Sequence, residues 1–468
     1  MSTWIDQELA TVQLGDQRRH CRLRQMVSAM VKTPGCSIPK AFQSHAEATA
    51  AYRFLHSPGV VPGDIMAAVS DAVAKRCAGL PLVLAIEDTT SFSFNHHPAT
   101  SGMGPLSGQV SGFLMHSVLM ATPDGVPLGL LDQTVWARDP DGPRTADLYQ
   151  KRPFADKESA RWVTALQAVP QRLDPTTRVL CLADREADIY ELFAAPRPAN
   201  ADLLIRNSNN RRVQGGPASY LWETLAAQPL AGELTLQLPR RAQEKPRTTR
   251  LEVRHCAVTL HPPAHRVGGE KLAPVPVAAV EARELDPPAG KKPIVWVLLT
   301  TLPVADLAAA LQCVADYSRR WLIERYHYTL KSGGCRFEDS QLQDYEALTR
   351  LLALQCLVAW RLLWLTYLSR AAPEQPCTVA FTDLEWRVLH LAVREIDPHF
   401  LRQSNYEASS GLPPALRTAV RWLGKLGGFL GRKGDGEPGI KVLWHGLATL
   451  NNIVLGAMIA QECKDRCV

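Results

Sequence analysis

Two short apolar runs in the first half of the chain each end in an aspartate, and they constrain the fold more than any other feature. The run Leu82–Ile86 leads into Asp88, and the run Arg178–Ala183 leads into Asp184. Apolar runs of this length are typical of strands that are buried on both faces of a sheet. Taken alone, a polar residue after a strand more often belongs to a turn or a helix cap. If the two strands are neighbours, however, Asp88 and Asp184 meet at one edge of the sheet.

The segments around these two strands predict an α/β fold with a mixed sheet. Asp124-Gly125 is a strong turn signal that joins two alternating runs into a hairpin. A helical pattern covers residues 156–168, and a further strand is expected over Asp202–Arg206. The resulting order of strand, hairpin, helix, strand, helix and strand indicates a mixed sheet that is flanked by helices.

The length of the chain, 468 residues, exceeds one ordinary core, so two or three domains are expected. Residues 1–62 have the pattern of a small helical unit, 63–370 contain the predicted sheet, and 371–468 follow a proline-containing linker and are helical. Within the central domain, residues 207–293 alternate in a way that predicts an all-β insertion. The apolar C-terminal helices fit a dimer contact and an ordinary core equally well.

Composition and missing motifs narrow the range of functions. The net charge is +6 and the pI is about 8.7, a mild excess that is compatible with a polyanionic partner. The eleven cysteines form no C-x-x-C pair, which favours a reducing cytoplasm over a zinc or disulfide framework. We find no signal peptide and no uninterrupted apolar run of membrane-spanning length, so no membrane partner is expected. The Walker A, Rossmann, H-E-x-x-H and G-x-S-x-G patterns are absent, so no nucleotide cofactor is expected.

The N-terminal unit carries a series of arginines among apolar residues. Arg18, Arg19 and Arg22 follow a Leu-Gly-Asp loop that is expected to cap a helix. Short helices with an arginine-rich face suit contact with DNA phosphates. A solvated basic face on an ordinary helical bundle explains the same pattern equally well.

A helix is predicted over Tyr317–Lys331, which contains neither proline nor glycine. At about 100° per residue, one narrow stripe of this helix collects a phenol, two cations and a carboxylate, namely Tyr317, Arg320, Glu324 and Lys331. The opposite side is apolar and can be buried. A surface salt bridge between Glu324 and Arg320, its i−4 neighbour, is the simpler explanation for this pair.

Asp88, Asp184 and Glu324 together offer a set of hard oxygen ligands. Such ligands suit Mg²⁺ or Mn²⁺, which keep open positions for phosphate oxygens and water. Two such ions about 3.5–4 Å apart activate an attacking oxygen and stabilise a leaving oxygen in an in-line displacement at phosphorus. The three acids therefore predict a metal-dependent phosphoryl-transfer site, in which Arg320 and Lys331 hold phosphate.

The chain resembles the bacterial DDE transposases of the IS-four family over nearly its whole length. The segments that carry this resemblance are 14–19, 51–54, 84–91, 116–119, 184–189 and 296–300. The most specific match is the family's Y-(2)-R-(3)-E-(6)-K signature, which is formed here by Tyr317, Arg320, Glu324 and Lys331. The resemblance implies an RNase H-like catalytic core with a β insertion, an N-terminal DNA-binding domain and a C-terminal dimerisation domain.

The resemblance also implies roles for individual residues. A catalytic triad that holds two Mg²⁺ or Mn²⁺ ions is implied for Asp88, Asp184 and Glu324. Contacts with the phosphates of the transposon end are implied for Tyr317, Arg320 and Lys331. Further DNA contacts are expected from Arg18, Arg19, Arg22 and Arg206.

Trp296 matches the family's tryptophan that stacks on a flipped base while a DNA hairpin forms and opens. An extruded base needs an aromatic surface to receive it, whereas the mid-strand position of Trp296 alone would indicate a core residue. The chain differs from a member of the family at two positions, where Asn95 replaces an arginine and Tyr328 replaces a lysine. Both differences remove a cation near the DNA.

The implied function is cut-and-paste transposition of double-stranded DNA. The resemblance implies that the enzyme nicks the transposon end, forms and opens a hairpin, and joins the 3′-OH to target DNA. It implies that the protein is a homodimer in its complex with DNA. It also implies a location in the bacterial cytoplasm, and on the nucleoid when the protein is bound to DNA. Two alternatives are a catalytically inactive DNA-binding inhibitor of transposition and a metal-dependent nuclease that does not join. The complete triad argues against the first, and Trp296 argues against the second.

Overall fold

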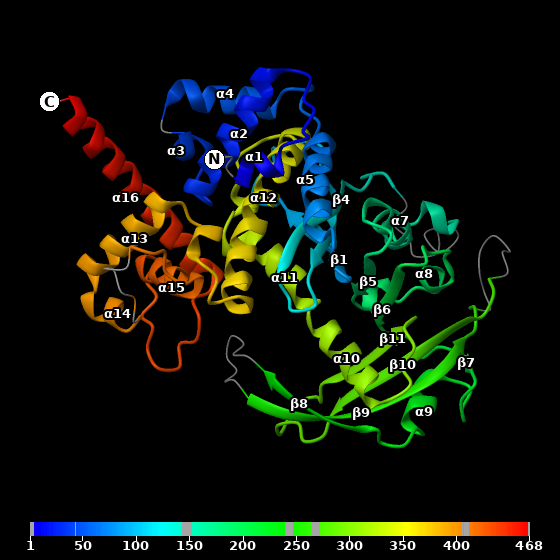
Figure 1. The fold of residues 1–468 in the computed structure, drawn as a ribbon. Helices are drawn as coiled ribbons and strands as arrows, with labels where there is room; N and C mark the ends of the chain where they lie inside the picture. Colours follow the sequence, from blue (N-terminus) through cyan, green and yellow to red (C-terminus); the bar gives the residue numbers. More distant parts are fainter. Residues whose placement is uncertain are drawn as a thin grey trace.

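A single mixed sheet lies at the centre of the computed structural model, which describes residues 4–42, 44–142, 152–238, 247–263, 272–404, 406 and 411–466 (Figure 1). Within these residues the strand order is β2-β3-β1-β5-β6-β11-β10-β9-β7, with β4 paired to β3 and β8 paired to β9. The strands of the first half are β1 (Leu82–Ser93), β2 (Gly104–Pro105), β3 (Ser111–Ala121), β4 (Pro127–Trp136), β5 (Arg178–Ala183) and β6 (Ala201–Arg206). The later strands are β7 (Val213–Gln214), β8 (Gly232–Leu238), β9 (Arg247–Leu260), β10 (Val275–Glu284) and β11 (Val295–Thr300).

Helices lie before, around and after this sheet. The N-terminal helices are α1 (Trp4–Glu8), α2 (Gln17–Lys32), α3 (Ile38–Phe42), α4 (His45–Leu55) and α5 (Pro62–Cys77). The central helices are α7 (Ala160–Ala168), α8 (Tyr190–Ala194), α9 (Leu221–Ala226), α10 (Leu307–Ser318), α11 (Trp321–Tyr328) and α12 (Tyr345–Ala371). The C-terminal helices are α13 (Asp383–Ile396), α14 (Pro398–Arg402), α15 (Leu416–Leu426) and α16 (Ile440–Arg466). The predicted α/β class, with a mixed sheet and helical segments at both ends, is confirmed.

The two strands that precede Asp88 and Asp184 are direct neighbours. β1 and β5 pair in parallel, and their register runs from Leu82 opposite Arg178 to Ile86 opposite Leu182. The pairing that the sequence permitted without requiring it is therefore confirmed. β1 does not end at Asp88, however, because it continues to Ser93 through antiparallel pairing with β3. Asp88 thus lies just beyond the part of β1 that pairs with β5.

The predicted hairpin around Asp124-Gly125 is also confirmed, as β3 and β4. Gly125 has φ +88°, a left-handed backbone conformation that a glycine adopts without strain. This hairpin places three antiparallel neighbours, β1, β3 and β4, on one side of β5. The parallel strands β5 and β6 lie on the other side of β1.

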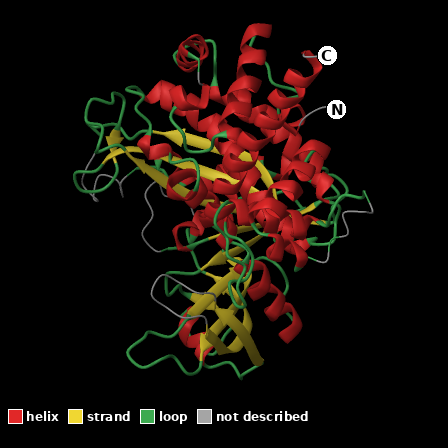
Figure 2. Cartoon of the chain, turned by 90° about the vertical axis from the view of Figure 1, so that its left-hand side faces the viewer, coloured by secondary structure: helices red, strands yellow, loops and turns green. Residues whose placement is uncertain are grey.

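The segment 207–293 extends the main sheet. Its strands β8, β9 and β10 pair antiparallel with one another, and β10 pairs with β11, which in turn pairs with β6. The segment was expected to be all-β, and its described residues contain the strands β7 to β10 but also the short helix α9. Figure 2 shows these strands reaching away from the helix-rich part of the molecule. The stretch 240–247 of this segment is basic in the sequence, and all of it except Arg247 lies outside the described residues.

The helix that was predicted over Tyr317–Lys331 is not continuous. α10 ends at Ser318 and α11 begins at Trp321, because the intervening backbone forms tighter i→i+3 hydrogen bonds, from Arg319 N to Asp316 O and from Arg320 N to Tyr317 O. Arg319 Nε also donates to Pro123 O in the β3–β4 turn at 3.0 Å, which fixes this corner to the sheet. After α11, residues Thr329–Gly333 form a π-helical turn.

Helices cover both faces of the sheet. α5 and α12 pack on β4, and α11 packs on β1. On the opposite face, the fully buried Trp162 of α7 contacts His116 of β3, with ring centroids 4.6 Å apart. Because side chains alternate along a strand, Asp88 and its neighbour Thr89 point to opposite faces of β1. Asp88 therefore faces α11, and Thr89 faces α7.

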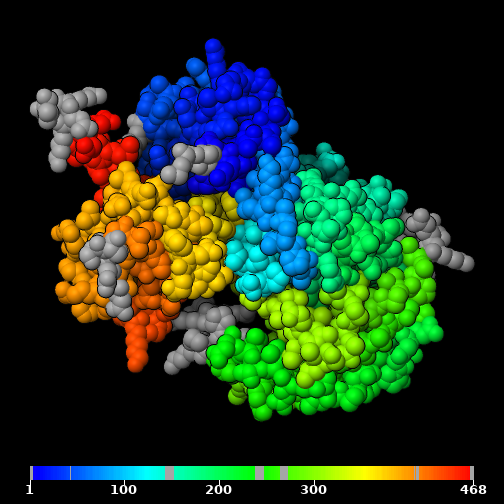
Figure 3. Space-filling model, in the orientation of Figure 1, coloured from blue at the N-terminus to red at the C-terminus, as the bar shows by residue number. Residues whose placement is uncertain are grey.

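Among the described residues, two helices are long and apolar enough to span a membrane by length and composition, although no such run was expected from the sequence. In α12 the most apolar window is 72% buried inside the protein, as in the core helix of a soluble protein. In α16 the corresponding window is only 22% buried, and Leu455, Met458 and Ile459 are exposed. Figure 3 shows that the N-terminal (blue), C-terminal (orange to red) and insertion (green) segments occupy different sides of the molecule. The apolar face of α16 is therefore an exposed surface of the C-terminal segment.

Candidate active site

Asp88 and Asp184 lie side by side at one edge of the sheet. Each follows the paired part of its strand by two residues, after Ile86 in β1 and after Leu182 in β5, which are direct partners in the register. The Asp184 side chain caps the turn that follows β5, since its Oδ1 accepts a hydrogen bond from Glu186 N at 2.8 Å. The Asp88 carboxylate accepts one from Thr89 N at 2.8 Å.

The pKa of Asp88 shows that the third acid, Glu324, lies near the two aspartates. Burial, together with the charges of Asp184 and Glu324, raises the pKa of Asp88 to about 7, although Arg320 acts in the opposite direction. The two aspartates and Glu324 are therefore close enough to repel one another. A site that holds several carboxylates at this cost is a candidate for function, because structural ion pairs more often lower a carboxyl pKa.

Glu324 is paired with Arg320 in this structure. An Arg320 N–H donates to Glu324 Oε1, four residues along the chain, so the simpler explanation from the sequence is realised. The Arg320 guanidinium is itself nearly buried, and its charge also acts on Asp88. Arg320 thus compensates part of the negative charge of the acidic group.

The sequence analysis missed His327 as a member of this site. His327 Nδ1 lies 3.7 Å from Asp88 Oδ2, and the ring is buried. Burial, together with the charges of Lys331 and Arg320, lowers the pKa of His327 to about 3, so the imidazole is neutral. Its position three residues after Glu324 places both side chains on one face of α11. That spacing was the signal in the sequence that would have identified it.

Arg206, Trp296, Tyr317 and Arg320 form a second group beside the acids. Trp296 on β11 meets Tyr317 at the end of α10 edge to face, with ring centroids 5.6 Å apart. The buried Tyr317 hydroxyl makes no hydrogen bond to any described residue. Burial raises the pKa of Tyr317, whereas Arg320 and Arg206 lower it. The predicted DNA-contacting residues from three separate elements are thus brought together, and Trp296 is only partly buried.

Lys331 lies in the π-helical turn that follows α11. Its Nζ is 5.3 Å from the centroid of the Phe92 ring on β1. Burial lowers the pKa of Lys331, while Glu338 and Asp88 raise it. Glu338 also accepts a hydrogen bond from Ser93 N at 2.7 Å, which joins the end of β1 to the segment after the turn. Lys331 is therefore held on the same side of β1 as Asp88.

The donor set fits a divalent cation in part. Asp88 and Asp184 are neighbouring carboxylates whose mutual repulsion a cation would remove. Glu324 is engaged with Arg320, and among the residues that the structure describes no three His, Cys, Asp or Glu side chains are close enough to hold a metal. A metal bound by all three acids therefore requires Glu324 to leave Arg320.

The remaining predicted residues lie away from the acids. Arg18 is exposed on α2, whereas Arg19 uses its guanidinium within the fold and donates to Leu14 O at 3.0 Å and to Gly59 O at 3.1 Å. Arg22 lines a groove between α2 and α16. Their predicted role in DNA binding remains a prediction.

The two positions that differ from the family member have local structural partners. Asn95 Oδ1 accepts a hydrogen bond from Ser111 N at 2.7 Å and holds the loop after β1. The Tyr328 ring packs on Gly333, where an added Cβ would lie 2.2 Å from Tyr328 Cε1, and Arg325 lies 4.8 Å from the ring centroid. Each side chain therefore stabilises its own loop or turn.

Three family models match the chain, and together they span most of it. A model described as transposase DNA-binding matches residues 1–60. A model described as transposase DDE domain matches residues 156–361, and one described as transposase Tn5 dimerisation domain matches residues 357–466. The DDE match contains Asp184 and Glu324, while Asp88 lies before it and is connected to it through the pairing of β1 with β5.

Proposed function

Because the chain belongs to the Tn5-like DDE transposases of the IS4 family, we propose that it moves a DNA segment by a cut-and-paste reaction. It has a DNA-binding domain, a DDE catalytic domain of RNase H-like fold and a dimerisation domain. It is an enzyme that depends on a divalent metal, typically Mg²⁺, and acts on DNA as a homodimer. The observation that carries the proposal is the parallel pairing of β1 with β5, which aligns Asp88 with Asp184 beside the helix of Glu324.

Asp88, Asp184 and Glu324 are the residues that we propose to hold two Mg²⁺ ions. When bound, the metal supplies charge stabilisation for the attacking and leaving oxygens of an in-line displacement at phosphorus. The chain contributes the positions of the acids, since Asp88 and Asp184 each lie two residues beyond the paired part of β1 and β5, and Glu324 lies on α11, whose apolar face is buried. His327, on the same helix as Glu324, lies within 3.7 Å of the Asp88 carboxylate.

The second group of residues is proposed to bind the DNA strand that reacts. Arg206, Arg320 and Lys331 are cations around the acids, and the Tyr317 hydroxyl lacks a hydrogen-bond partner among the described residues. Charged donors of this kind form strong hydrogen bonds with phosphate oxygens. When a phosphate reaches Arg320, the guanidinium has an alternative partner to Glu324, so DNA binding and release of Glu324 are proposed to occur together.

The reaction that we propose has four chemically similar steps. Water nicks the transposon end, the freed 3′-OH attacks the opposite strand to give a hairpin, water opens the hairpin, and the 3′-OH joins target DNA. Each step breaks one phosphodiester bond as an oxygen attacks in line, so a single acidic site serves all four. Trp296 is proposed to receive the base that must leave the stack when the hairpin forms.

The proposed cellular setting follows from these partners. The dimer joins two transposon ends and then target DNA, and it works in the bacterial cytoplasm on the nucleoid. No nucleotide cofactor is proposed, because hydrolysis of a phosphodiester bond by water is favourable in itself and each attack by a 3′-OH exchanges one phosphodiester bond for another. The exposed apolar face of α16 is the proposed contact between the two copies.

Substitution of Trp296 by alanine tests the proposed hairpin step. We expect Trp296→Ala to nick an end duplex, meaning DNA that carries the terminal repeat bordering the gene, at nearly the wild-type rate. Hairpin formation should fall by about 10- to 100-fold, because stacking of one base on an aromatic ring is worth about 1–3 kcal/mol. Both products are measured on denaturing gels in the presence of Mg²⁺.

Two outcomes of this experiment point to the alternative functions. Wild-type protein that nicks ends but never gives hairpin or joined product would indicate a nuclease that does not join. Wild-type protein that binds ends without cutting them would indicate an inhibitor of transposition. Normal hairpin formation by Trp296→Ala would remove the stacking role alone. Tyr220→Ala, at an exposed aromatic residue preceding α9, serves as a matched control and should leave all products unchanged.

A further inference from the structure

Arg161 connects the two strands of the acidic pair from the opposite face of the sheet. This arginine belongs to α7, and its Nε donates to Thr89 Oγ1 at 2.9 Å. Its Nη2 donates to Glu186 Oε1 at 2.5 Å. Thr89 follows Asp88 directly, and Glu186 is two residues after Asp184. One guanidinium therefore bridges the backbone segments that carry the two aspartates.

The surroundings of Arg161 hold its guanidinium in this position. Its Nη1 donates to Glu158 O at 2.6 Å, and the group lies 5.6 Å from the ring centroid of Trp136 and 5.3 Å from that of Trp162. Only 10% of the Arg161 side chain is exposed. Three of its five N–H donors, one on each nitrogen, are engaged by protein acceptors, which fixes the guanidinium as a structural group.

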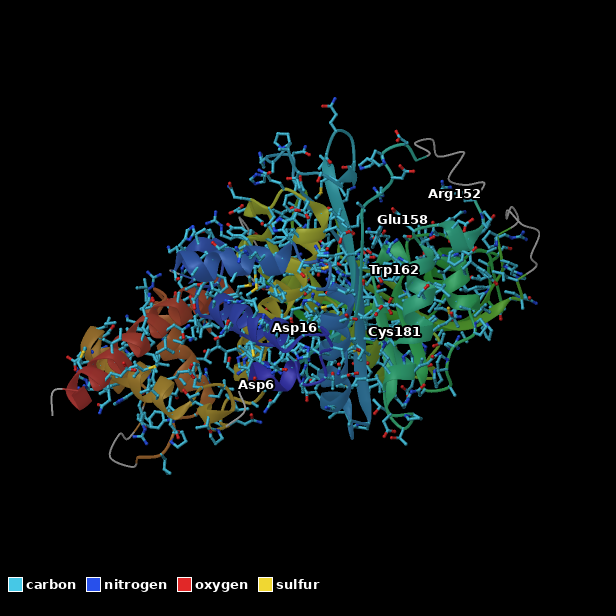
Figure 4. The ribbon with its side chains drawn as sticks, turned by 90° about the horizontal axis from the view of Figure 1, so that it is seen from above. Asp6, Asp16, Arg152, Glu158, Trp162 and Cys181 are labelled. Atoms are coloured by element: carbon cyan, nitrogen blue, oxygen red, sulfur yellow. The ribbon has the colours of Figure 1, made fainter. Side chains whose placement is uncertain are left out.

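The segment before α7 is itself anchored to the sheet. The Glu158 carboxylate accepts hydrogen bonds from Arg138 Nε and Nη2, both at 2.7 Å, and from Trp136 Nε1 at 3.1 Å. Figure 4 shows Glu158 and Trp162 beside the strands of the sheet. The start of α7, which carries Arg161, is therefore attached to the end of β4.

Thr89 links Arg161 to the buried His116 in the core of the sheet. The Thr89 hydroxyl, whose oxygen accepts from Arg161, is also hydrogen-bonded to Nδ1 of the His116 ring at 3.0 Å, which leaves Nε2 facing Glu87. That Nε2 lies 3.6 Å from Glu87 Oε2. Arg161, Thr89, His116 and Glu87 thus form one polar chain behind Asp88.

We propose that Arg161 is a positioning residue that sets the separation of Asp88 and Asp184 required for binding a divalent cation. It touches neither aspartate and acts through Thr89 and Glu186. Parallel pairing of β1 with β5 ends at Ile86 and Leu182. No hydrogen bond between these two strands therefore fixes the distance from Asp88 to Asp184. The inference rests on the proposed role of Asp88 and Asp184 as metal ligands.

The test measures Mn²⁺ binding by the full chain in complex with a pre-cut end duplex, from the paramagnetic signal of free Mn²⁺. We expect Arg161→Gln to weaken Mn²⁺ binding by about 10- to 100-fold, as is common for residues that orient metal ligands. Arg161→Lys should be similarly impaired, because an ammonium group cannot reach two partners in the geometry of the guanidinium fork. Wild-type Mn²⁺ affinity in Arg161→Gln would overturn the inference.

Arg178→Gln is the matched control, since Arg178 pairs with Asp202 at 3.2 Å at the other end of β5 and 59% of its side chain is exposed. It should leave Mn²⁺ affinity unchanged. Melting temperatures are recorded for every variant, and a lower melting temperature of Arg161→Gln with unchanged Mn²⁺ affinity would show a merely structural role. If Arg161→Gln does not fold, Glu186→Gln decides, with weaker Mn²⁺ binding supporting the inference and wild-type binding overturning it.

Asp88→Asn separates this inference from the proposed function. If Asp88→Asn binds Mn²⁺ as tightly as the wild type, the proposed metal site is wrong, and the positioning role of Arg161 falls with it. If Asp88→Asn loses Mn²⁺ binding but Arg161→Gln does not, the metal site stands and only the inference on Arg161 fails.

Discussion

Replacement of either strand-end aspartate by asparagine is expected to abolish DNA cleavage and to leave the fold intact. In Asp88→Asn and Asp184→Asn we expect the rate of end nicking to fall by about 1,000-fold or more. An amide is a weaker ligand than a carboxylate, and the loss of several kcal/mol of transition-state stabilisation corresponds to that factor. Binding of the uncut end duplex should persist.

The fold is expected to tolerate both substitutions because asparagine can accept the same backbone hydrogen bonds as the two carboxylates. Burial raises the pKa of Asp88 to about 7, with Asp184 adding to the effect, so the ionised form is disfavoured in the folded protein. The resulting loss of stability grows as the pH rises from about 4 to 7, and Asp88→Asn should therefore be at least as stable as the wild type at pH 8. Asparagine caps the turn after β5 as well as aspartate does.

The measurement is nicking of the end duplex in Mg²⁺, together with the melting temperature of each variant. Cleavage near the wild-type rate in both variants would contradict the assignment of the active site. Loss of activity accompanied by unfolding would contradict the claim that the two acids serve function alone.

Asp188→Asn, in contrast, is expected to destabilise the fold, although Asp188 is only four residues from Asp184. We expect this variant to lose about 3–5 kcal/mol of unfolding free energy, because it leaves the buried charge of Arg211 without its partner. For a domain of this size the corresponding fall in melting temperature is about 10 °C. Thermal unfolding of the full chain measures it.

The reason lies in the contacts of the Asp188 carboxylate, which is fully buried. Its Oδ1 accepts from Arg211 Nε and Nη2 at 3.0 and 2.6 Å. Its Oδ2 accepts from the backbone N–H groups of Ser208 and Asn209 at 2.8 and 3.0 Å, and from the side chain of Asn207 at 3.0 Å. One carboxylate therefore organises the loop that follows β6 and Arg206. An asparagine offers a single acceptor oxygen, and its amide donors face those of the loop.

Asp184→Asn is the matched control for this prediction, since it makes the same chemical change in the same segment. A melting temperature of Asp188→Asn within about 2 °C of the wild type would contradict the structural role. Equal destabilisation by both substitutions would contradict the separation of a functional and a structural aspartate.

The strands of the catalytic sheet could be predicted from the sequence because each of them is marked by a short local pattern. Two apolar runs that end in aspartates, and a glycine turn between the strands of a hairpin, determine the strands and their order. The neighbour relation of β1 and β5 was only permitted, since it depends on pairing between segments about a hundred residues apart. The extension of β1 past Asp88 was missed because it arises from pairing with β3, which compensates for the polar residues there.

The details of the site depended on contacts that the sequence does not reveal. The break between α10 and α11 carries no glycine or proline, and Arg319 is held by Pro123 in a distant turn. Asp188 lies within the segment 184–189 that carries the resemblance, and its loop partners approach only in the folded chain. His327, by contrast, stands three residues from Glu324 and was open to prediction from helical spacing.

A metal-specificity switch at Asp88 and Asp184 tests most directly whether these acids form one metal-dependent site for DNA cleavage. A cysteine thiolate is a softer ligand than a carboxylate, and it accepts Mn²⁺ more readily than Mg²⁺. We predict that Asp88→Cys and Asp184→Cys fail to nick the end duplex in Mg²⁺ and regain nicking in Mn²⁺, while the wild type is active with both ions. Nicking by either cysteine variant at the wild-type rate in Mg²⁺ would contradict direct coordination of the metal by that aspartate.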